Sequence, residues 1–189
     1  IVVKDVTEQA NYQRRLEALH NHASQLSLLE TREDVAHWTM EVIRELLGME
    51  IGTFGIVEQN KVVFREYKEN SLTDELDINA RGITLRAIRT GETQLVPDTR
   101  KDPDYIMGST NRGVITLSEL DVPIKIDEKV VAIINLESWE LDAFSYEDRR
   151  LVETLAEHVS SALSRISYRS RLTAIHSFAV EISKHTKTD

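Results

Sequence analysis

The sequence predicts an α+β domain. An antiparallel sheet of five or six strands carries long terminal helices on one face and a loop-rich cup on the other. Three observations lead to this prediction. Apolar residues near both termini follow alternating steps of four and three, the spacing of a packed helix face. Residues 51–58 and 61–67 flank a two-residue turn, as in a β-hairpin. The stretch Val130–Leu136 is apolar on both faces, as a central strand covered on both sides must be.

Four helices are predicted, over residues 10–30, 31–47, 82–90 and 145–185. The hydroxyl of Thr31 can cap the second helix with Asp34 three residues on, and Gly48 closes it. Ser145 and Asp148 form a similar capping pair. The last helix contains no Gly or Pro, and its roughly forty residues would span ~60 Å at 1.5 Å per residue. It must therefore extend beyond the domain.

The remaining strands are predicted at 93–96, 117–126 and 130–136. The strand at 117–126 alternates apolar residues with Glu119, Asp121 and Lys125, so we expect it to be half buried. The polar stretch 68–81 is interpreted as a loop. The irregular connection 98–113 has the length that proteins usually keep for binding or gating.

Composition disfavours several classes of partner. The formal net charge is -9, which disfavours nucleic acid because phosphate binding depends on clustered Lys and Arg. The chain has no cysteine, so thiolate chemistry and disulfides are excluded. Its longest apolar stretch falls far short of the ~20 residues that span a bilayer. We expect a cytoplasmic protein with no direct membrane contact.

The two ends of the chain resemble each other. Residues 12–33 align with residues 168–189 at a constant offset of 156. We therefore expect residues 167–189 to contain an exit helix and the start of a second domain of the same kind. The alternative is that two amphipathic helices share Leu and Ala through composition alone. His20 and His176 also match, and exposed helix positions are favoured for them over phosphoacceptor sites. Identical pairs are Tyr12/Tyr168, Arg15/Arg171, Leu16/Leu172, Ala18/Ala174, His20/His176, Ala23/Ala179 and Ser27/Ser183, and near matches are Leu19/Ile175 and Leu26/Ile182.

Several short motifs follow this order of elements. They are Thr90-Gly91-Glu92, Val96-Pro97-Asp98, Asp102-Pro103-Asp104-Tyr105, Ser118 to Ile124, Asn135 to Ser138 and Phe144 to Asp148. With them, residues 31–166 resemble a GAF domain, preceded by a signalling helix at 10–30. Residues 1–9, with Lys4 to Glu8, resemble the end of a PAS domain. This layout implies a prokaryotic sensor of a two-component system, most often a histidine kinase.

The resemblance implies a small ligand, of unknown identity, held between the sheet and the cup loops. For Arg86, a solvent-exposed position is the alternative, and for Asp98 an Asx turn is. Ser118 and Asn135 have the alternative role of tying down strand edges or loops. The candidate ligand-binding residues are Tyr67, Arg86, Asp98, Tyr105, Met107, Thr116, Ser118 and Asn135.

Catalysis and cofactor binding find no support in the sequence. Bilin attachment and the methionine sulfoxide reductase activity of the resembled family both use cysteines. A haem needs an axial donor, and no histidine lies between Trp38 and Glu157. We predict no cofactor and no metal. The favoured function is a non-catalytic sensory module that relays ligand occupancy through its helices. The alternative is a dimerisation and spacer module whose cup is filled by its own side chains.

The four-three stripes of both terminal helices predict a parallel homodimer. Leaving such stripes in water costs about 25 cal/mol per Å² of apolar area. The alternative is that the stripes pack on each other within one chain. The predicted interface residues are Leu16, Leu19, Leu26, Leu172, Ile175 and Ile182.

Overall fold

The computed structural model describes residues 13, 15–20, 22–48, 51–66, 71–106 and 115–185; the side chains of 65, 66, 71–74 and 180–185 lie outside this description. The PAS-like residues 1–9 and the candidates Tyr67 and Met107 also lie outside the described residues. Their predicted roles stay predictions.

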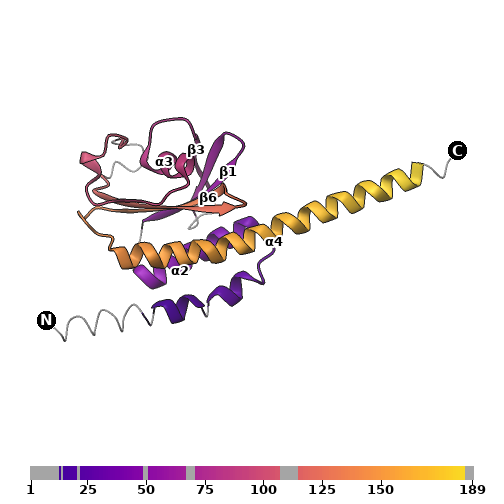
Figure 1. Cartoon of the computed structure of the whole chain (residues 1–189), viewed down its shortest axis with the longest axis horizontal. Helices are drawn as coiled ribbons and strands as arrows, with labels where there is room; N and C mark the ends of the chain where they lie inside the picture. The colour runs from indigo at the N-terminus through magenta and orange to yellow at the C-terminus, as the bar shows by residue number, and fades with distance from the viewer. Residues whose placement is uncertain are drawn as a thin grey trace.

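A six-stranded antiparallel sheet, in the order β3-β2-β1-β6-β5-β4, forms the centre of the domain. Figure 1 shows it between α3 (Ile83–Thr90) on one side and α2 (Arg32–Leu47) and α4 (Tyr146–His185) on the other. Strand β6 lies between β1 and β5, so the central position predicted for residues 130–136 is confirmed. The predicted fold class and strand number are confirmed as well. The strands are β1 (Gly52–Glu58), β2 (Lys61–Glu66), β3 (Ser71–Asp77), β4 (Gln94–Val96), β5 (Ser118–Ile126) and β6 (Lys129–Ser138).

The prediction of a loop over residues 68–81 was wrong for Ser71–Asp77, which form strand β3 and pair with β2. This strand is the outermost of the sheet and has a strongly polar sequence, SLTDELD. An edge strand needs few apolar side chains, so its composition resembles that of a loop. Leu76 lies opposite Val62 and packs on the core of that face.

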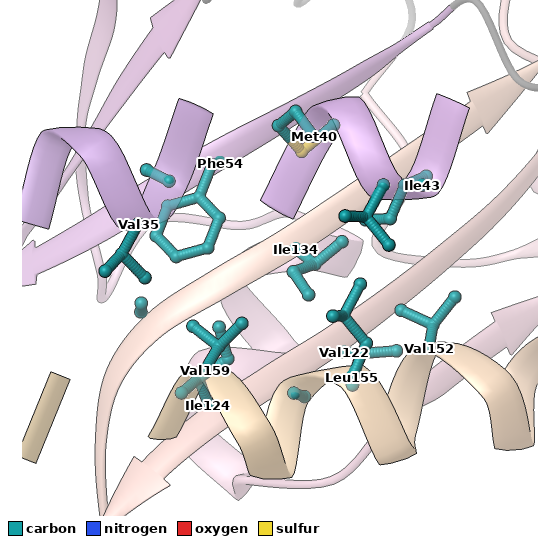
Figure 2. Packing of buried hydrophobic residues seen from close by; sticks show 14 of the residues in the cluster. Val35, Met40, Ile43, Phe54, Val122, Ile124, Ile134, Val152, Leu155 and Val159 are labelled. Carbon is teal, nitrogen blue, oxygen red and sulfur yellow. The ribbon is translucent and has the colours of Figure 1, made fainter. Parts of the chain in front are cut away.

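Helices α2 (Arg32–Leu47) and α4 (Tyr146–His185) cover one face of the sheet. The predicted caps of α2 are confirmed: the Thr31 hydroxyl accepts from the backbone N–H of Asp34, and Gly48 adopts the left-handed conformation. Figure 2 shows side chains from both helices converging on the strands. The labelled residues are Val35, Met40, Ile43, Phe54, Val122, Ile124, Ile134, Val152, Leu155 and Val159.

Residues 15–20 and 22–26 are helical and lie on the side of α2 and α4 away from the sheet (Figure 1); we call them the N-terminal helix. Leu19 and Leu26, 0% and 2% exposed, join the same core, and Leu16 packs on it partly buried. Arg15 pairs with Asp148 at 3.0 Å. The dimer interface predicted for these leucines is therefore corrected: the helices of one chain cover them, which is the alternative left open by the sequence.

The opposite face carries helix α3 (Ile83–Thr90) and the short 3-10 turn η1 (Thr99–Lys101). A second, smaller core lies between α3 and the β1–β2–β6 part of the sheet. Within the described ranges, no helix combines the length and the apolar character needed to cross a bilayer. The buried members of the second core are Val62, Phe64, Leu85, Ala87, Ile88 and Ile133.

Candidate functional site

Two carboxylates of β5 lie buried beneath α3. Residues of a strand alternate between its faces, and Leu120 and Val122 belong to the core under α2 and α4. Glu119 and Asp121 therefore face the cup, where they are only 5% and 0% exposed. The prediction that this strand is only half buried was wrong, because α3 and the adjoining loops cover its polar face.

Asn135 of β6 joins these two carboxylates. Its Nδ2 donates to Glu119 Oε1 at 3.0 Å and to Asp121 Oδ1 at 3.1 Å. Its own Oδ1 accepts from the hydroxyl of Thr53 at 3.1 Å. The strand register places Thr53, Asn135 and Asp121 in one row across β1, β6 and β5. The candidate Asn135 is thus central to the site.

Two threonines complete the polar group. The Thr84 hydroxyl of α3 donates to Glu119 Oε1 at 2.9 Å. Thr116 donates to Glu137 Oε2 at 2.9 Å, so this candidate also lies beside the site. We call Glu119, Asp121, Asn135 and Glu137 the acidic cluster. Within it, Asp121 Oδ2 is buried and has no hydrogen-bond partner among the described residues.

Burial dominates the electrostatics of the acidic cluster. It raises the pKa of Glu119 well above the usual range, and the charge of Asp121 raises it further. Burial likewise raises the pKa of Asp121, against the hydrogen bonds that it accepts. The site therefore favours either a bound proton or a bound cationic group.

Arg86 has a different role from the one predicted. Its guanidinium donates to both carboxylate oxygens of Asp102, at 2.9 and 2.7 Å, to Asp104 at 2.7 Å and to Gln94 at 2.9 Å. These bonds raise the pKa of Arg86, and the pKa of Asp102 is lowered by the same pairing. Its donors thus fasten α3 to the 98–106 connection.

The other candidates lie around this connection or behind the sheet. Asp98 accepts from the backbone N–H of Arg100 and pairs with Arg100 and Lys101, which is the Asx turn left open by the sequence. Tyr105 is half-buried, and its carbonyl accepts from Arg81. The ligand-binding role predicted for Ser118 is corrected, because Ser118 faces the helical side of the sheet. There its hydroxyl donates to the Glu140 carbonyl and ties down the loop after β6.

Sequence reasoning missed Glu119 and Asp121. The available signal was a pair of carboxylates two residues apart in the strand next to the fully apolar one. Such a pair shares one face of a sheet. Helix α3 covers that face of the sheet, and both carboxylates are then buried.

The comparisons with known proteins agree on the fold. A yeast protein, the free methionine-R-sulfoxide reductase of Saccharomyces cerevisiae (strain ATCC 204508 / S288c), is 31% identical over 83 residues, which are 43% of this chain and 44% of the relative. The chain thus matches less than half the length of that curated relative. The structure of free methionine-R-sulfoxide reductase from Neisseria meningitidis with its substrate has a TM-score of 0.70 at 21% identity, covering 84% of this chain and 93% of that one.

A second solved structure has a similar fold. The GAF domain of a phosphoenolpyruvate-protein phosphotransferase from Acinetobacter has a TM-score of 0.71 at 13% identity, covering 82% and 95% of the two chains. The family model described as "GAF domain" matches residues 30–164, well over half of the sequence. The six-stranded sheet, its helical face and its covered cup thus have the family's architecture, and this chain belongs to the GAF domain family.

Proposed function

We propose that this chain is a non-catalytic GAF module that binds a small molecule carrying a protonated amine at the acidic cluster. The observation that carries the proposal is the unpartnered Asp121 Oδ2, which is buried beside a second buried carboxylate. A buried polar atom left without a partner costs about 1–3 kcal/mol. A bound donor would remove that cost.

A protonated amine suits the chemistry of the cluster. An ammonium group has three donors and no acceptor, and an ionised carboxylate has acceptors but no donor. Glu119, Asp121 and Glu137 lie on one face of β5 and β6, and one bound cation would offset part of the repulsion between their charges. Bonds between ionised groups are also about twice as strong as neutral ones.

The apolar half of the cup limits the size of the ligand. Phe64, Leu85, Ile88 and Ile133 are buried there between α3 and the sheet. This packing is what favours the spacer function as a second candidate, since the cup is partly filled by its own side chains. A ligand at the acidic cluster would therefore be small, on the scale of an amino acid.

The relatives suggest one such ligand. Free methionine-R-sulfoxide, named in the reductases, is an amino acid with a free amine. Reducing a sulfoxide to a thioether takes two electrons, which thiols supply by forming a disulfide. This chain contains no cysteine, so we propose binding without reduction.

Occupancy would be relayed through the strands that carry the cluster. Residues of β5 alternate between the two faces, so Asp121 faces the ligand while Val122 packs among the core residues of α4 (Figure 2). A shift of β5 on binding would reach α4 directly.

The test is calorimetric titration of the chain with free amino acids, methionine sulfoxide included, and with their N-acetyl forms. We expect binding of at least one free amino acid and none of its N-acetyl form, which lacks the charged amine. Asp121→Asn should weaken binding by about 10-fold or more, as a lost charge-assisted bond does. Asp127→Asn is the matched control, because Asp127 is exposed at the turn of the same hairpin.

Four outcomes would contradict this function. Binding of the N-acetyl form with equal affinity would rule out amine recognition. Binding of Mg²⁺ in the absence of any amino acid would indicate a metal site instead. Methionine produced from methionine sulfoxide and dithiothreitol, above the level without protein, would show a catalytic domain. Failure of every free amino acid to bind would favour the spacer function.

A further inference from the structure

The last part of α4 has an apolar stripe that its own domain does not cover. Burial along α4 ends at Ile166, which is 8% exposed, and the helix continues away from the sheet (Figure 1). Among the described side chains beyond it, four large apolar ones are 49–66% exposed, namely Tyr168, Leu172, Ile175 and Phe178.

The side of α4 that faces the domain is different. Ser170, Thr173, Ala174 and Ser177 line a hollow of about 520 Å³ together with the turn at Leu29 and Glu30. At about 100° per residue, these small side chains lie nearly opposite Leu172 and Ile175 around the helix. The stripe therefore faces away from this domain, and an external surface must cover it.

The internal repeat indicates which surface that is. At the offset of 156, Leu172, Ile175 and Ile182 correspond to Leu16, Leu19 and Leu26. The structure places Leu19 and Leu26 in the core beside α2 and α4, with at most 2% exposure. The same pattern is thus buried at Leu19 and Leu26 at one end of the chain and exposed at Leu172 and Ile175 at the other.

We propose that residues 168–182 are the N-terminal helix of a second GAF unit, and that Leu172, Ile175 and Ile182 dock on that unit's counterparts of α2 and α4. The polar matches agree with this docking. Arg15 holds Asp148 at the start of α4, so Arg171 would hold an acidic residue at the start of the second unit's closing helix. One continuous helix would then be the last element of one unit and the first of the next.

The experiment transplants the segment within this chain. Residues 12–27 are replaced by the sequence of residues 168–183, and thermal unfolding is compared with the parent. A control inserts the sequence of residues 169–184 instead, which has nearly the same composition but puts Thr173, His176 and Ser183 at the buried positions. The transplant requires Gln13→Arg, Arg14→Ser, Glu17→Thr, Leu19→Ile, Asn21→Ser, His22→Phe, Ser24→Val, Gln25→Glu and Leu26→Ile.

We expect the transplant to melt within about 5 °C of the parent and the shifted control to melt more than about 10 °C lower, or without a cooperative transition. Equal losses in both variants, or equal stability of both, would overturn the proposal. Sedimentation of the parent chain tests the competing occupant. We expect a monomer at low micromolar concentration. A dimer that Leu172→Asp with Ile175→Asp abolishes would assign the stripe to a second copy and overturn the proposal.

Discussion

At the scale of single residues, Glu119 and Asp121 are buried carboxylates with few hydrogen-bond donors around them. Ionised carboxylates need either water or donors, and here a single amide, that of Asn135, donates to both. Thr84 adds one further bond to Glu119 from α3. Stability and the proposed ligand binding therefore depend on the same few atoms, and folding leaves Asp121 Oδ2 without a donor among the described residues.

The protonation of Glu119 makes stability depend on pH. Its pKa is about 4.5 in an unfolded chain and well above that when folded, so the folded chain binds protons more tightly. The free energy of unfolding must then fall as the pH rises from about 4.5 through the raised pKa. Glu119→Gln should remove this loss and raise the free energy of unfolding at pH 8 by on the order of 1–3 kcal/mol, with little effect at pH 4.5.

Urea denaturation at both pH values measures this difference. Glu92→Gln is the control, because Glu92 is exposed and should leave the pH dependence unchanged. Parallel pH curves for Glu119→Gln and the parent would contradict the buried, raised pKa of Glu119.

The sequence predicted part of this site. Alternation along residues 117–126 correctly placed Glu119 and Asp121 on one face of the strand, and Asn135 was a candidate. That α3 covers this face depends on the crossover between distant segments, which local periodicity does not contain. Burial, and with it the chemistry of the carboxylates, was therefore beyond sequence reasoning.

At the scale of elements, α3 is held to the cup by Arg86. The side chain of Arg86 is 24% exposed and that of Asp102 is 12% exposed, so their ion pair is largely shielded from water. Arg86→Lys keeps the charge but loses the two parallel bonds to Asp102 and the bond to Gln94. We expect it to lower the free energy of unfolding by about 1–3 kcal/mol and to speed amide exchange over residues 83–106.

Arg149→Lys provides the comparison for Arg86. Arg149 forms a pair with Glu153 at the helix surface, where both side chains are more than 30% exposed. Such exposed pairs contribute about 0.3–0.5 kcal/mol. Equal effects of the two variants would contradict a fastening role for Arg86.

Gly55 allows β1, β2 and β6 to close beneath α3. A Cβ at this position would lie 2.6 Å from Val62 Cγ2 and 2.7 Å from Ile133 Cγ2. Gly55→Ala should therefore cost about 1–3 kcal/mol by overpacking. Combining it with Val62→Ala removes the nearest of these contacts, so the double variant should lose less free energy of unfolding than the two single variants summed, as measured by urea denaturation. Strict additivity would argue against this close contact.

Local signals explain which elements were predictable. Thr31 and Gly48 bound α2 through contacts within four residues, and both were correctly identified. The hairpin was also correctly predicted, and its turn residue Gln59 has a positive φ of 54°. Strand β3 was missed because its pairing with β2, rather than its composition, makes it a strand.

At the scale of the whole molecule, one stripe pattern has two different surroundings. The four-three spacing identified both terminal helices, but spacing does not say what covers a stripe. For the N-terminal helix the cover is α2 and α4 of the same chain, because Arg15 and Arg165 anchor it at both ends. For the end of α4, the domain supplies no cover to Leu172 and Ile175 among the described residues.

This contrast makes Leu19 and Ile175 a matched pair of probes. Leu19 is fully buried, although the sequence assigned it to the signalling helix outside the domain. Leu19→Ala should therefore lower the free energy of unfolding by about 2–4 kcal/mol through lost burial and a cavity. Ile175 is 66% exposed, and Ile175→Ala should change it by less than about 0.5 kcal/mol. Urea denaturation of both variants measures the difference. A small effect at Leu19 would separate the N-terminal helix from the folded unit, and a large one at Ile175 would mean that another chain already covers the stripe.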